Sequence, residues 1–298
     1  MVPLIFQRIK IYNIKFKNRK MKTIFRKNVK FIFAVALVLV ASIGYTQTKG
    51  SGNVITDDRN TGDFTSIKLT CSADLYISQG SKSVTVKADD NIIEMVETTV
   101  ENGTLVIGVK GRGFRSISVL EVYITTPDLD KLKNSGSGDI VFNDTFTATE
   151  LFIGINGSGD LHAKFDVRNL ELQVSGSGDT ELTGVRGIFK VSNSGSGDLD
   201  AESLKLEECY IKNSGSGDME LVGKTNNLTA TINGSGDFDG YNLTAVNATI
   251  SNSGSSDITV NVVEKLQVSL NGSGDLTYRG NPEKVDVRSN GSGDVYRK

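Results

Sequence analysis

The sequence has few of the residues that usually build catalytic and metal centres: one His and two Cys among 298 residues, with no Trp. A Ser-His-Asp triad, a zinc site or a thiol–imidazole pair cannot be assembled from one His and two Cys whose repeat positions do not match. His162 falls at an outward position of the repeat described below, so we expect a solvated surface imidazole. Cys71 and Cys209 are interpreted as packed thiols. This composition argues against an enzyme.

Acidic residues are absent from residues 1–46, which hold ten of the 33 Lys and Arg, all between Arg8 and Lys30. The rest of the chain carries 23 basic and 35 acidic residues, a net charge of −12. A chain this acidic is expected to avoid nucleic acid and anionic membranes, and to attract cations.

Residues 1–46 have the pattern of a signal peptide, with Met21 as an alternative start. Basic residues from Lys22 to Lys30 precede an apolar run from Phe31 to Ile43, which is too short to span a membrane. We expect cleavage near Gln47, export to the periplasm, cell surface or extracellular space, and no membrane insertion afterwards. An uncleaved membrane anchor is the alternative.

One phrase, Gly-Ser-Gly-Asp, returns nine times after residue 133, once with Ser256 in place of the second Gly. Its aspartates are separated by 18 to 21 residues: Asp139, Asp160, Asp179, Asp198, Asp218, Asp237, Asp257, Asp275 and Asp294. A fixed period of this length indicates a solenoid built from stacked repeats.

Counted from each Asp as position zero, the repeat alternates apolar and polar residues. Position −7 is always aliphatic, from Leu132 to Val287, and positions −9 and +1 are apolar in eight of nine copies. Because this period of two indicates half-buried strands, each unit is predicted as a strand, a turn, a second strand and a connection. The chain is therefore predicted to be all-β, a right-handed parallel β-helix with coils of about 19–20 residues. A β-propeller is the alternative.

Three segments are predicted: a signal peptide (1–46), an N-terminal β segment with degenerate coils and a cap (47–133), and the nine-repeat solenoid (134–298), continuous with the segment before it. In the second segment Asp74 fits position zero, and a hairpin is expected around Asn102-Gly103.

Two turn positions have alternative interpretations. Four coils have Asn at the inward position −5, among them the adjacent Asn193 and Asn213. These Asn either stack as an internal ladder or extend the turn. Gly at −3 is invariant, whereas −1 accepts Ser256, so −3 is predicted to hold the left-handed conformation.

The chain resembles the auto-transporter adhesin, head GIN domain family, from about Asp63 to Asp294. The resemblance rests on Gly154-Ile155-Asn156 before a turn, on Ala88-Asp89-Asp90-Asn91, and on Asn102-Gly103-Thr104. It implies an exported β-solenoid with an adhesive role and no catalytic residues.

An acidic stripe is expected on the outer surface, where positions zero and +2 both point outward. Its members are Asp179, Glu181, Asp198, Asp200, Asp218, Glu220, Asp237 and Asp239. Each Asp at zero is expected to accept N–H groups of its own turn, which requires no cofactor. Ca²⁺ bridging adjacent coils is the alternative.

Two functions are compatible with this pattern. The first is an exported, non-catalytic structural or adhesive module at the cell surface or in the envelope. The second is a carbohydrate-active enzyme or glycan-binding protein on a parallel β-helix. The sequence identifies no partner, and a surface glycan or a protein is expected.

Overall fold

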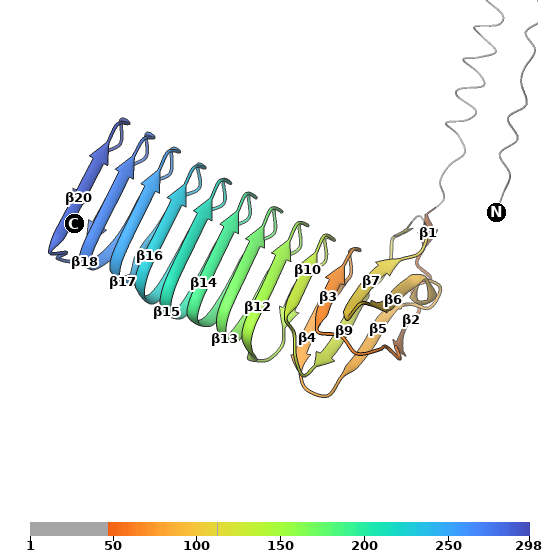
Figure 1. Cartoon of the computed structure of the whole chain (residues 1–298). Coiled ribbons are helices and arrows are strands. Elements are labelled where there is room, and N and C mark those ends of the chain that lie inside the picture. Colours follow the sequence, from red (N-terminus) through yellow and green to blue (C-terminus); the bar gives the residue numbers. More distant parts are fainter. Residues whose placement is uncertain (1–46, 112) are drawn as a thin grey trace, which may run out of the picture. The chain divides into compact units, whose positions relative to one another are not determined.

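The repeats wind into coils that stack along one axis, so that equivalent residues of successive coils become hydrogen-bonded neighbours (Figure 1). The computed structural model describes residues 47–111 and 113–298, and the predicted signal peptide lies outside the described residues. All strand pairs between coils are parallel, and the coils are about 19 residues apart over about nine turns. The predicted parallel β-solenoid is confirmed.

Each central coil is one long strand rather than the predicted pair of short ones. Each strand ends five residues before the next turn Asp, and all but the first, which starts seven residues after Asp139, begin directly after the preceding Asp. The central strands are β12 (Phe146–Ile155), β13 (Leu161–Val174), β14 (Thr180–Asn193), β15 (Leu199–Asn213), β16 (Met219–Ile232), β17 (Phe238–Asn252) and β18 (Ile258–Leu270). The connections stay paired with their neighbours through local register shifts, because their lengths differ by only one or two residues.

The core lies inside the coils, where the side chain at each inward position stacks on the side chain at the same position of the next coil. Leu172, Val191 and Ile211 at position −7 are buried, as are Leu161 and Leu199 at position +1. The polar residues between them point outward. Burial of apolar side chains from both sides of every coil supplies the main stabilisation of the solenoid.

The N-terminal segment covers the first coil, which consists of β3 (Ser66–Leu69) and β4 (Asp74–Gln79). On one side β3 pairs with β7 (Thr104–Val109), and β7 forms an antiparallel hairpin with β6 (Val96–Glu101). The predicted Asn102-Gly103 turn joins them, and both residues have positive φ, as a type I′ turn requires.

On the other side β4 pairs with β9 (Leu120–Thr126). Two antiparallel strands continue this sheet: β5 (Ser83–Asp89) and β2 (Val54–Asp58). A 3₁₀ turn (Ile93–Met95) and the short pair of β1 (Thr48–Lys49) and β8 (Phe114–Arg115) complete the segment. The N-terminal edge of the coil stack is therefore covered by strands of the chain itself.

Like the first coil, the second coil and the coil after β18 are made of separate short strands. The second coil comprises β10 (Lys131–Asn134) and β11 (Ile140–Phe142), and it pairs with both the first coil and the central strands. After β18, the chain continues through β19 (Leu276–Arg279) and β20 (Lys284–Ser289) to β21 (Val295–Arg297).

Candidate functional site

The two glycines of each turn allow successive coils to approach closely. A Cβ on Gly176 would lie 1.6 Å from the carbonyl oxygen of Gly157. A Cβ on Gly178 would lie 2.1 Å from the carbonyl oxygen of Gly159, its equivalent in the preceding coil. Neither glycine has positive φ, so the predicted left-handed conformation at position −3 is wrong. At both positions a Cβ would point at the preceding coil. That contact excludes a Cβ at position −3, whereas position −1 accepts the Cβ of Ser256 in one turn. Cys71 and Ala73 occupy these positions in the first coil, which has no such turn before it.

The buried Asn residues at position −5 brace their own turns. Asn213 donates to the carbonyl oxygen of Gly217 (3.1 Å) and accepts from the N–H of Gly215 (3.0 Å). Asn134 and Asn252 make the same pair of bonds. The interpretation of Asn as a turn-extending residue is therefore confirmed, and the bonds of these side chains run within a coil instead of forming a ladder.

The Asp side chains at position zero connect each coil to the next. Asp179 N–H donates to Asp160 Oδ1 (2.8 Å), and Asp198 N–H donates to Asp179 Oδ1 (2.9 Å). The same bond recurs along the turn edge from Asp74 to Asp294. The expected bond to the Asp's own turn is wrong, because the N–H of each Asp points back to the preceding coil, where a carboxylate meets it. The turn motif is thus an inter-coil clamp.

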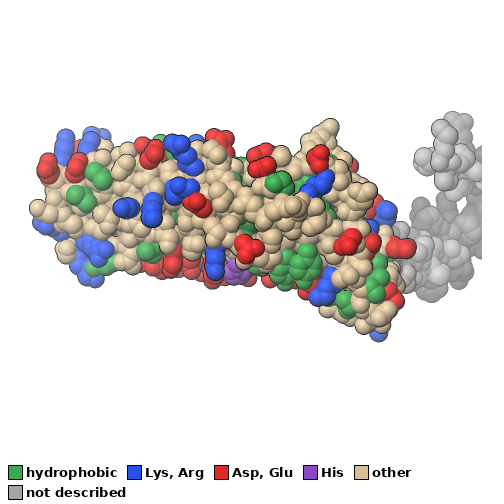
Figure 2. Space-filling model, turned by 90° about the horizontal axis from the view of Figure 1, so that it is seen from below, with side chains coloured by type: hydrophobic (Ala, Val, Ile, Leu, Met, Phe, Trp, Pro, Cys, Tyr) green, Lys and Arg blue, Asp and Glu red, His purple; other side chains and the backbone are tan. Residues whose placement is uncertain are grey.

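The second row of the acidic stripe lies at position +2, two residues beyond this clamp. Glu181 is in register with Asp200, Asp200 with Glu220, and Glu220 with Asp239. Partial burial raises the pKa of Asp200, and the negative charges of Glu181 and neighbouring aspartates raise it further. Figure 2 shows these acidic side chains as a run along one margin, beside the one His.

Within residues 47–111 and 113–298, the stripe does not form a group of three or more ligating side chains with an arrangement suited to a metal ion. The Ca²⁺ alternative stays a prediction. Cys71 and Cys209 are both free thiols, as expected, and burial raises the pKa of Cys209 to about 12.

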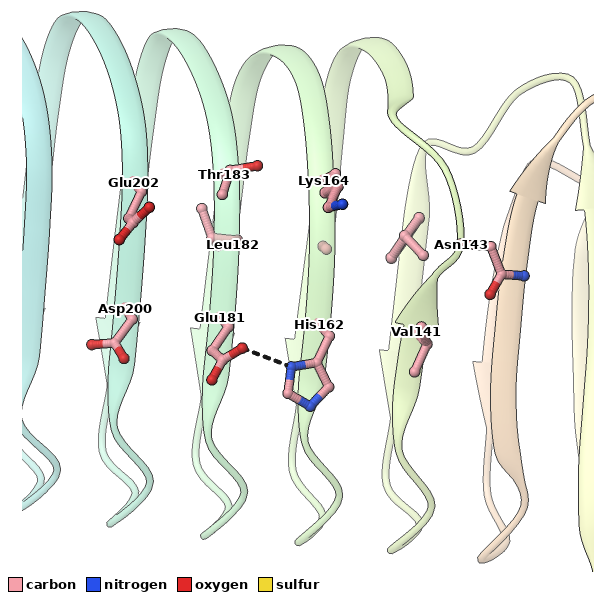
Figure 3. Close-up of a pocket in the computed structure, with 11 residues that line it drawn as sticks. Val141, Asn143, His162, Lys164, Glu181, Leu182, Thr183, Asp200 and Glu202 are labelled. Atoms are coloured by element: carbon pink, nitrogen blue, oxygen red, sulfur yellow. Dashed lines mark hydrogen bonds and ion pairs between the residues drawn. The ribbon is translucent and has the colours of Figure 1, made fainter.

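His162 and two members of the stripe, Glu181 and Asp200, line a groove of about 580 Å³ on the outer sheet face. His162 Nδ1 lies 3.0 Å from Glu181 Oε2, and both side chains are substantially exposed (Figure 3). Figure 3 shows His162, Glu181 and Asp200 side by side on neighbouring strands, all projecting from one sheet face. A carboxylate pair for glycoside cleavage needs two carboxyl groups on opposite sides of the scissile bond. This arrangement instead resembles a charged contact surface.

A row of cations lies at the opposite end of the coils, where the connections are. Arg186 is in register with Lys205, and Lys205 with Lys224. These side chains line a groove of about 690 Å³ together with Phe165, Leu204 and Thr244, which we name the cationic groove. Lys and Arg side chains cross the middle of the face seen in Figure 2.

Only one of the three cations has a carboxylate partner in the part of the chain that the structure describes. Arg186 forms an ion pair with Asp166, whereas Lys205 and Lys224 form none there. Three stacked cations repel one another, so the groove has a net attraction for anions.

Sequence reasoning missed the cationic groove because its residues fall in the variable connection. Arg186 and Lys205 lie seven residues after their turn Asp, whereas Lys224 lies six residues after its own. The coil between Asp198 and Asp218 holds one extra residue, and Ser203 in its connection has a φ of +56°. Counting forward from each Asp, with one residue of tolerance, would have aligned the three cations.

The fold and these surfaces define a class: a parallel β-solenoid whose turns clamp neighbouring coils and whose charged groups form open rows rather than an enclosed site. The family model described as "Putative auto-transporter adhesin, head GIN domain" matches residues 63–222 and 189–282. The chain belongs to this family.

Several solved structures share the fold. A "putative adhesin" from Parabacteroides merdae has a TM-score of 0.64 and 21% identity, covering 85% of this chain and 99% of that one. A "putative lipid binding protein" from Parabacteroides distasonis has a TM-score of 0.63 and 23% identity, covering 85% of this chain and 100% of that one. No curated protein matches the chain. No helix in the described part of the chain is long and apolar enough to cross a membrane.

Proposed function

We propose that this protein is an exported, non-catalytic adhesion module that acts at the cell surface. Membership of an adhesin-like family and the signal-peptide pattern of residues 1–46 support this proposal. The observation that carries it is the presentation of the same kinds of side chain once per coil, on open faces of a continuous solenoid. Neighbouring coils lie about 4.8 Å apart, so a linear polymer lying along the coil axis meets a similar group at regular intervals.

The cationic groove is the contact surface that the geometry favours for this role. It is concave, it spans the three coils of β14, β15 and β16, and two of its cations form no ion pair within residues 47–111 and 113–298. A polymer with regularly spaced negative charges, such as an acidic glycan, complements such a row. Each cation contributes modestly, because exposed ion pairs stabilise weakly and the attraction is screened by salt.

Binding of residues 47–298 to an array of neutral and acidic glycans tests this assignment. The matched pair of variants is Lys205→Gln/Lys224→Gln in the groove and Lys68→Gln/Lys212→Gln on exposed sheet positions away from it. Both doubles remove two positive charges. The groove double should weaken binding to acidic glycans by about tenfold, equivalent to ~0.7 kcal/mol for each lost cation, and the control double should not.

Three other outcomes contradict parts of the proposal. Equal losses in the two doubles would show that net charge, and not the groove, controls binding. Binding restricted to neutral glycans would move the contact surface elsewhere. Release of shortened glycan products would overturn the non-catalytic assignment and favour the enzyme alternative.

A further inference from the structure

The row of side chains in the cationic groove continues past the groove, toward the C-terminal coils. Lys224 is in register with Thr244 of β17, which also lines the groove. Thr244 is in register with Asn261 of β18, and Asn261 with Arg279 of β19. All of these side chains are exposed or half-buried. Because each coil contributes one of them, Arg279 lies about 14 Å beyond Lys224 and about 24 Å beyond Arg186 along the coil axis.

An aromatic ring holds the side chain of Arg279 in place. Between the paired positions Gly240 and Thr244, β17 has three residues that have no partner in β18, and Tyr241 is the first of them. The guanidinium carbon of Arg279 lies 3.8 Å from the centroid of the Tyr241 ring, and Lys298 Nζ lies 5.3 Å from the same centroid. A guanidinium stacked on a ring is restrained in orientation, and its N–H groups stay free at its rim.

Arg279 is a second cationic position on the same row as the groove. It forms no ion pair within residues 47–111 and 113–298. The planar fork of an Arg side chain binds a carboxylate or a sulfate through two parallel hydrogen bonds. Figure 2 shows Lys and Arg side chains in the middle of this face and again at its C-terminal end.

The two coils between the groove and Arg279 contribute neutral polar side chains to the row. Asn261 Nδ2 donates to Thr244 Oγ1 (3.0 Å). This bond leaves the hydroxyl proton of Thr244 as a donor and Asn261 Oδ1 as an acceptor. A donor and an acceptor side by side suit the hydroxyl groups of a sugar, which can accept from the first and donate to the second.

We propose that the cationic groove is one end of a longer track, and that a linear acidic glycan lies along the six coils from Arg186 to Arg279. This inference rests on the proposed function, because the groove supplies the first contact. Carboxylates or sulfates of the glycan meet the groove cations at one end and Arg279 at the other, and sugar hydroxyls meet Thr244 and Asn261 between them. A single-stranded nucleic acid fits less well, since it requires aromatic faces for its bases and Arg279 already covers the Tyr241 ring.

Such a track makes affinity depend on the length of the glycan. A chain that spans about 10 Å reaches only the three groove cations, whereas one that spans at least about 24 Å also reaches Arg279. The second contact is intramolecular once the first has formed, so it adds affinity without a second loss of translational freedom. An exposed charge-assisted contact to one Arg corresponds to about fivefold in affinity.

Isothermal titration calorimetry of residues 47–298 with short and long oligogalacturonates and heparin oligosaccharides tests the track, and the two series separate carboxylate from sulfate recognition. We expect Arg279→Gln to weaken binding of the long chains about fivefold and to leave binding of the short chains unchanged. Arg288→Gln, which removes the same charge from an exposed position on β20, should change neither. Tyr241→Ala should lose part of the gain, whereas Tyr241→Phe keeps the ring and should retain it. Each variant should keep the circular dichroism spectrum of the wild type.

Failure of the track and failure of the groove give different results. If Arg279→Gln binds the long chains as well as Arg288→Gln does, the track is overturned, and the groove stands as long as Lys205→Gln/Lys224→Gln weakens both lengths. If the wild type binds neither series at either length, both proposals are overturned. Single-stranded DNA of the longer span that binds with the same dependence on Arg279 would overturn the choice of a glycan.

Discussion

Replacing Gly176 by Ala would place a methyl group between two coils that have no room for it. The new Cβ would lie 1.6 Å from the carbonyl oxygen of Gly157, whereas ordinary contacts begin at 3.4 Å. The coils must therefore separate locally by roughly 2 Å, close to half of their spacing. That movement disrupts the three hydrogen bonds that Ser175, Ser177 and Asp179 donate to the preceding coil, at 2.9, 3.3 and 2.8 Å. At a net ~1 kcal/mol for each bond, we expect a loss of about 3 kcal/mol.

Thermal unfolding of residues 47–298 followed by circular dichroism measures this loss. For a domain of this size the expected decrease in Tm is about 6–12 °C. Ser177→Ala, between the two turn glycines, is the matched control and should lower Tm very little. Gly176→Asn distinguishes the cause, because Asn tolerates positive φ but carries a Cβ. A Gly176→Asn variant as stable as wild type, or a Gly176→Ala variant as stable as Ser177→Ala, would refute the close-approach explanation.

Three further predictions concern the turns and the acidic stripe. Asn213→Ala should cost about 1–3 kcal/mol in chemical denaturation, because Gly215 N–H and Gly217 C=O lose their buried partner, and an unchanged midpoint would contradict the bracing role. Asp200→Asn should raise Tm at pH 7: the pKa of Asp200 is raised in the folded chain, so stability falls as pH rises through that pKa. The gain should vanish below the ordinary Asp value of about 3.9, and a gain that persists there would point to another cause. Melting in millimolar Ca²⁺ should match melting in chelator, whereas a Ca²⁺-dependent increase in Tm that Glu181→Gln/Asp200→Asn/Glu220→Gln abolishes would assign the ion to the stripe.

The coil architecture was predictable because the apolar residues fall at the same positions, counted from the turn Asp, in every unit. Leu172, Val191 and Ile211 each lie seven residues before an Asp, and all three are buried. Such a regular pattern determines which face of each strand is buried and therefore which residues stack. The separate strands predicted on either side of each connection were wrong, because connections of nearly equal length remain paired between coils.

The roles of the turn residues were harder to predict, because they depend on the neighbouring coil. Because position −1 accepts Ser256, the sequence suggested that a left-handed backbone conformation requires the glycine at position −3. A single repeat does not show that the Cβ of another residue at that position would point at the neighbouring coil. The Asp clamp likewise joins two repeats. The cationic groove depends on register shifts in the connections, which displace Lys224 by one position relative to Lys205.

Protease shaving of living cells that express the full chain, with mass spectrometry of the released peptides, tests most directly the claim that this solenoid acts outside the cell. The account predicts peptides from residues 47–298 in the released fraction, an N-terminus near Gln47 and no peptide from residues 22–45. Peptides found only after lysis, with residues 22–45 still attached, would contradict it.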